Sequence, residues 1–155
     1  MLEELTERIT AAVLGRSGDQ AVRALLLAYR SYVVQHPNRY SAMSQHPFPT
    51  RTALVADRLL GVLLAVLAGF GLEGSEAIHM ARCLRSAVHG FAVLEAAGGF
   101  GLAEDLDASY DLLVHLLIAG LHTPDSGPHL TTGRRPTPSP VAKLVLTACD
   151  KEKPR

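Results

Sequence analysis

A run of fourteen residues without a charge, from Leu59 to Leu72, limits what this chain can become more than any other feature. The run is too short for a membrane-spanning helix, which needs about 20 apolar residues. It also contains Gly61, Gly69 and Gly71. Because 48% of the 155 residues are hydrophobic, the rest of the chain can cover it. We therefore expect a helix buried at the centre of a folded domain, with no membrane as partner.

Apolar residues before and after this run recur at the spacing of an α-helix. Gly15, Pro37, Gly74 and the pair Gly98-Gly99 mark the breaks, since glycine and proline end helices. Helices are expected over residues 2–14, 17–35, 38–44, 50–70, 76–97 and 104–121. The predicted fold is an all-α helical bundle over residues 1–122.

Residues 123–155 have a different composition. They hold six of the nine prolines, and six basic residues against three acidic ones. Such a segment predicts a mildly basic, Pro-rich and mostly unstructured tail. Residues 141–149 are apolar enough to dock on a protein surface, and a short strand, a short helix and neither stay open there.

The helix expected over residues 76–97 carries two apolar lines instead of one. The first consists of Met80, Leu84, Val88, Phe91 and Glu95, and the second of Cys83, Ala87, Gly90 and Leu94. Small side chains, which the second line has in excess, let another helix approach closely. The two lines therefore predict two separate buried contacts for one helix.

Charge and cysteine content limit the possible functions of the protein and the cellular compartments in which it can work. Fifteen Lys and Arg balance fifteen Asp and Glu, so the chain has no broad cationic surface for phosphates. Two cysteines, Cys83 and Cys149, are too few for a disulfide framework and indicate a reducing compartment. The acidic start at Glu3 and Glu4 is unlike a secretory signal. We expect a cytoplasmic protein that does not bind DNA by itself.

The segment RSAVHGFAVLEAAGGFGL at residues 85–102, followed by DASY at 107–110 and IAGL at 118–121, resembles TetR/AcrR-type transcriptional regulators. The likeness is to the C-terminal region of their His-Gly subclass. AYR at 28–30 and HPNRY at 36–40 are similar to an earlier block of the same family, in the same order. The resemblance covers residues 1–122 and implies an effector-binding and dimerisation domain.

The resemblance also implies where the sites lie. In the family, the last two helices of two subunits form a four-helix bundle, so we expect a homodimer. The residues expected at its interface are Ala87, His89, Gly90, Leu94, Leu113, Leu116, Leu117 and Gly120. The remaining helices usually enclose a pocket for a small apolar effector. The candidate walls of that pocket are Tyr29, Tyr32, Met43, Leu63, His79, Met80 and Cys83.

The chain departs from the family pattern in one respect. A member is expected to begin with a helix-turn-helix domain that enters the major groove, and no segment here corresponds to it. We therefore expect an effector-sensing domain of such a regulator without its own DNA-binding domain. An alternative is an interaction protein that pairs with a full-length regulator and blocks its DNA binding.

A further alternative is a small helical ligand carrier or enzyme that uses His79, His89 and Cys83. His79 and Cys83 are four residues apart, with Glu76 one turn earlier, so a metal could meet all three. Three ligands from one helix rarely complete a site, however, and the sequence has no phosphate loop, nucleophile elbow or zinc-protease motif. We predict no catalytic residue, metal or cofactor, and we expect His89 to be hydrogen-bonded near the subunit interface.

Overall fold

The computed structural model describes residues 2–44 and 50–123, and the side chains of residues 2–40 and 54–123. This part of the chain forms six α-helices and no strand, which confirms the all-α prediction. The helices are α1 (Leu2–Val13), α2 (Gly18–Gln35), α3 (Pro37–Ser44), α4 (Thr50–Ala68), α5 (Gly74–Ala96) and α6 (Leu106–Leu121). The tail predicted over 123–155 and its apolar segment at 141–149 lie outside the described residues, apart from residue 123.

Local chemistry sets the ends of these helices. Gly15 after α1 and Gly98 after α5 have φ values of +73° and +68°, which a residue with a Cβ rarely adopts. The Asp105 carboxylate accepts a hydrogen bond of 2.9 Å from the backbone N–H of Asp107 and caps α6. Pro37, expected only to stop the second helix, also begins α3, because its fixed φ suits a first helical turn.

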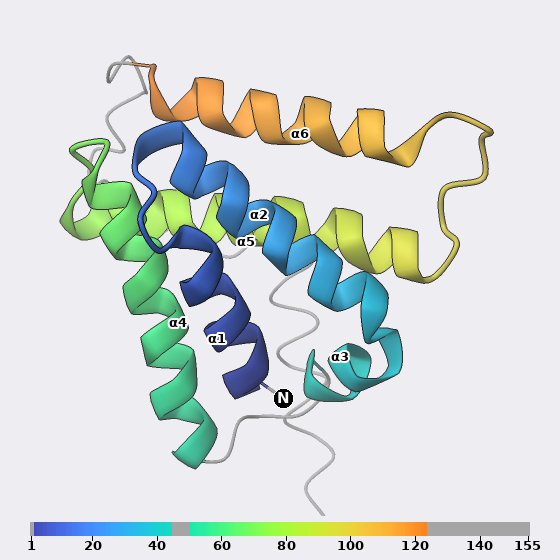
Figure 1. Ribbon diagram of the computed structural model, residues 1–155, viewed down its shortest axis with the longest axis horizontal. Coiled ribbons are helices and arrows are strands. Elements are labelled where there is room, and N and C mark those ends of the chain that lie inside the picture. The colour runs from blue at the N-terminus through green and yellow to red at the C-terminus, as the bar shows by residue number, and fades with distance from the viewer. Residues whose placement is uncertain (1, 45–49, 124–155) are drawn as a thin grey trace, which may run out of the picture. The chain divides into compact units, whose positions relative to one another are not determined.

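Helix α2 is the central element of the described region. It packs against α1, α3, α4, α5 and α6, and Figure 1 shows it crossing α5 with α6 along one side and α1 along the other. Its buried side chains point in several directions, and Leu26 and Tyr32 are fully enclosed. This central helix therefore positions every other helix of the described region.

The prediction that the charge-free run forms the centre is wrong. Within residues 59–72, all of which the structure describes, Leu60 is 42% exposed and Leu67 alone is buried. The run offers mostly small residues such as Gly61 on one side, so it provides less contact area than the aromatic and branched residues of α2. Part of its remaining apolar surface faces a cavity instead of packed atoms.

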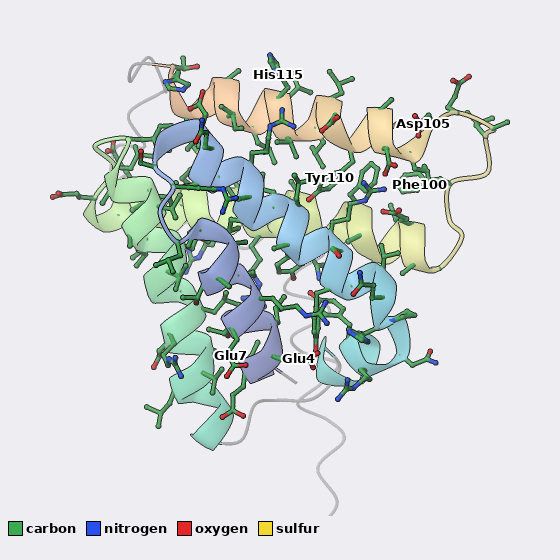
Figure 2. All side chains as sticks on the ribbon, viewed as in Figure 1. Glu4, Glu7, Phe100, Asp105, Tyr110 and His115 are labelled. Atoms are coloured by element: carbon green, nitrogen blue, oxygen red, sulfur yellow. The ribbon has the colours of Figure 1, made fainter. Side chains whose placement is uncertain are left out.

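Helix α6 packs against α2 and α5 with one side only. Tyr110 and Val114 are buried there, and Figure 2 shows Tyr110 directed from α6 toward α2 while His115 points away. On the outer side, Leu112 and Leu116 are each 61% exposed. The pair α5 and α6 thus has one packed side and one uncovered apolar side within the described chain.

Candidate functional site

A cavity of about 260 Å³ lies among helices α1, α2, α3, α4 and α5. Most of its wall is apolar, and four polar side chains complete it: Tyr29, Tyr40, Arg82 and Arg85. The apolar lining residues are Leu2, Leu5, Ile9, Leu25, Leu26, Ala56, Leu59, Leu60, Leu63, Ile78, Ala81, Leu84 and Val88. A largely apolar wall with a few polar groups is the usual composition of a small-molecule site.

The exposure of the lining residues separates a closed end from an opening. Leu5, Ile9 and Leu26 are at most 1% exposed, so the cavity is sealed where α1 meets α2. Leu60 of α4 and Ile78 of α5 are 42% and 41% exposed. The exposed part of the cavity wall therefore lies on α4 and α5, and we call it the opening.

Tyr29, Tyr40 and His89 form a hydrogen-bonded series, which we call the Tyr-Tyr-His network. The hydroxyl groups of Tyr29 and Tyr40 share a hydrogen bond, and the Tyr40 hydroxyl lies 2.6 Å from Nδ1 of His89. The rings of Tyr40 and His89 pack with their centres 5.5 Å apart. This network joins the cavity wall on α2 through α3 to α5.

Burial keeps the network uncharged near neutral pH. It raises the pKa of the Tyr29 and Tyr40 hydroxyls, although the positive charge of Arg85 acts in the opposite direction. Burial lowers the pKa of His89, and the charge of Arg85 lowers it further. Both phenols are therefore protonated at pH 7 and the imidazole is neutral.

A second polar group lies between α2, α5 and α6, and we call it the Arg30 cluster. The Arg30 guanidinium donates bonds of 2.6 and 2.7 Å to the Glu95 carboxylate and lies 2.8 Å from that of Asp107. It also lies over the rings of Tyr110 and Phe91, at 4.7 and 5.7 Å from their centres. The hydrogen bonds that Arg30 donates to Glu95 are the main reason why the pKa of Arg30 is raised. The cluster fixes α5 and α6 to the central helix.

This cluster was not predicted from the sequence. Glu95 was placed on an apolar line of its helix, and a carboxylate in such a position needs a buried cation. Arg30, in the AYR block at 28–30, is that cation. The single charged residue on that apolar line, Glu95, indicated that a cation must lie nearby. The spacing of residues could not identify the cation, because Arg30 is 65 residues away.

The predicted pocket residues are not gathered in one place. Tyr29 and Leu63 line the cavity. Tyr32 is buried beside His36, away from the wall. The remaining three with described side chains do not line the cavity either: His79 and Cys83 are exposed and Met80 is half-buried. Met43 lies in α3, with its side chain outside the described residues. Ligand binding by any of these residues stays a prediction.

Several of the predicted interface residues lie on the uncovered side of α5 and α6, which we call the α5–α6 face, whereas Leu113 and Leu117 pack partly against the core. Leu94 and Leu116 are 49% and 61% exposed, and Gly120 is also exposed. A Cβ added to Gly90 would meet no atom within 4 Å. The half-buried members are Ala87, His89, Gly90, Leu113 and Leu117. The described part of the chain therefore leaves this strip accessible, and its role in dimerisation stays a prediction.

No three His, Cys, Asp or Glu side chains within residues 2–44 and 50–123 lie close enough together to hold a metal ion. None of the helices in the same ranges combines the length and apolar character needed to cross a bilayer.

Comparison with known proteins gives one family match and two related regulators. The family described as tetracyclin repressor-like, C-terminal domain, matches residues 22–117. An uncharacterized HTH-type transcriptional regulator of Mycobacterium tuberculosis, Rv0681, is 35% identical over 125 residues, covering 78% of this chain and 56% of the relative. The uncharacterized HTH-type transcriptional regulator YobS of Bacillus subtilis is 31% identical over 121 residues, covering 77% of this chain and 63% of the relative. The chain thus spans somewhat more than half the length of both regulators.

Proposed function

Because the chain belongs to the tetracyclin repressor-like C-terminal domain family, we propose that it is the effector-sensing and dimerisation domain of a cytoplasmic transcriptional regulator. The observation that carries the proposal is the apolar cavity of about 260 Å³ lined by the first five helices. A small apolar ligand in such a cavity gains dispersion contacts with the atoms that line it. The effector is accordingly a small molecule with a largely apolar body.

The second part of the proposal concerns pairing. The α5–α6 face exposes Leu94, Leu112 and Leu116, and exposed apolar side chains on one face favour contact with another protein. Gly90 at its centre leaves open space, so a helix of a second copy can approach closely there. We assign the homodimer to this face.

The Tyr-Tyr-His network provides a route from the cavity to the proposed interface. Tyr29 lines the cavity, and His89 at the other end of the network precedes Gly90 on α5. A ligand that favours one position of Tyr29 would change the hydrogen bond to Tyr40 and, through it, the placement of His89. Such a ligand shifts the population between two packings of the dimer.

We assign no contact with DNA to residues 1–122. They carry nine basic and twelve acidic residues, a mildly acidic balance that does not favour phosphate binding. The output of the domain is therefore a change in dimer geometry, which a DNA-binding domain would have to detect.

Sedimentation of the purified chain and its Gly90→Leu variant tests the dimer. We expect a dimer mass for the chain and a monomer mass for Gly90→Leu, since the larger side chain blocks close helix approach. Gly61→Leu is the matched control, because Gly61 of α4 also has open space around it and lies off the α5–α6 face. A monomer mass for the unchanged chain, or a dimer mass for Gly90→Leu, contradicts the proposed pairing.

A further inference from the structure

We infer that the cavity binds an amphipathic anion, with its apolar part inside and a carboxylate at the opening between Arg82 and Arg85. This inference rests on the proposed function and deepens it by naming the chemical class of the effector. It follows from the charge of the cavity wall, from the pairing of its arginines and from the position of the opening.

The charge of the wall is entirely positive. Among the described lining residues, Arg82 and Arg85 carry charge and none is a carboxylate. They are three residues apart on α5, so they lie on neighbouring turns of one side of the helix. Two guanidinium groups at this spacing offer donors in the planar arrangement that carboxylates accept.

Among the described residues, these two arginines also lack an internal counter-ion. Within residues 2–40 and 54–123, neither Arg82 nor Arg85 lies within 4.0 Å of a carboxylate oxygen. Arg30, by contrast, contacts both Glu95 and Asp107. The anionic partner of the two cavity arginines is therefore free to come from a ligand.

The position of the opening sets the orientation of that ligand. Both arginines are exposed and share the rim with Ile78 and Leu60, whereas the opposite end is closed by fully buried leucine and isoleucine. A carboxylate at the closed end would lose its hydration without a partner, which is costly. At the rim it keeps water and gains two guanidinium groups, while the apolar part fills the interior.

The head group would also act on the Tyr-Tyr-His network. Arg85 lies close enough for its charge to affect Tyr29, Tyr40 and His89. A carboxylate beside Arg85 neutralises much of that charge. The same contact that holds the ligand therefore changes the electrostatic surroundings of the network that leads to α5.

A matched pair of probes tests the inference: octanoate and 1-octanol have the same chain length and differ in the charge of the head group. We expect calorimetry at low salt to give a Kd for octanoate at least about tenfold below that for octanol. In the double variant Arg82→Gln/Arg85→Gln, the ratio of the two Kd values should approach one. The double variant Arg16→Gln/Arg23→Gln removes two positive charges outside the lining and should keep the ratio of the unchanged chain.

Each other outcome overturns the inference. Equal affinity for the two probes would show that the cavity does not distinguish a charged head group from a neutral one. The proposed effector cavity would not be contradicted by that result, because both probes bind. A preference for octanoate that survives in Arg82→Gln/Arg85→Gln would place the anion elsewhere. Binding of neither probe would count against the cavity as an effector site as well.

Discussion

Two arginine-bearing regions of this protein are built in opposite ways. In the Arg30 cluster, a guanidinium that is only 13% exposed contacts two carboxylates and two aromatic rings. At the cavity opening, Arg82 and Arg85 are exposed and have no carboxylate partner among the described residues. A charge whose partners are all internal holds helices together, whereas a charge left without a counter-ion beside a cavity is available to a ligand. Burial and ion pairing thus distinguish Arg30, which holds helices together, from the two arginines that we propose bind a ligand.

Replacement of Arg30 by Met should produce the largest effect, because it removes one side of a mostly buried ion pair. Glu95, which is 14% exposed, would lose the partner that compensates for its burial. We expect the free energy of unfolding, measured by urea denaturation, to fall by about 2–4 kcal/mol. Arg23→Met is the matched control, since Arg23 pairs with Asp111 at the surface and should cost at most about 0.5 kcal/mol. Equal losses of unfolding free energy for the two variants would show that the Arg30 cluster stabilises the fold no more than a surface ion pair does.

The pH dependence of stability should come from His89 of the Tyr-Tyr-His network. Its expected effect on the free energy of unfolding is smaller than that of Arg30→Met. Burial lowers the pKa of His89 in the folded chain below its ordinary value of about 6.5. Above pH 6.5 the imidazole is neutral in both states, so it contributes no slope. As the pH falls below 6.5, the unfolded chain binds the proton more readily, and stability decreases until the folded imidazole is also protonated.

Urea denaturation between pH 7 and pH 5 measures this slope. His89→Gln should make the slope shallower, while His115→Gln, which changes an exposed imidazole on α6, should leave it as it is. The Arg30 guanidinium stays charged throughout this range, because hydrogen bonds to Glu95 raise its pKa further above the usual value of an arginine. An unchanged slope in His89→Gln would mean that burial does not lower the pKa of His89 enough to affect stability.

The same comparison shows what could be predicted from the sequence. Helix ends were predictable because they depend on local chemistry, as at Gly15, Gly98 and Asp105. The two apolar lines of α5 were also visible, since helical spacing alone determines which residues share a side. Pairings such as Arg30 with Glu95 were not, because nothing in local spacing identifies a partner 65 residues away.

The cavity shows a second limit of sequence reasoning. Apolar spacing indicates which side of a helix faces inward, but it does not indicate where facing helices fail to touch. Tyr29 and Leu63 were proposed and line the cavity, whereas Tyr40 and the two arginines of the rim were not proposed. A cavity depends on the relative placement of several helices, so its wall had to be read from the structure.

The smallest expected effect is the most direct test of the difference between the two regions. Removing both charges at the cavity opening, in Arg82→Gln/Arg85→Gln, should change the free energy of unfolding by no more than about 0.5 kcal/mol, as for most surface substitutions. A slight gain at low salt is expected, because like charges three residues apart on a helix repel each other. Urea denaturation at low and high salt measures both the size and the sign. A loss as large as that of Arg30→Met would show that these arginines hold the fold together, and the distinction between the two regions would then fail.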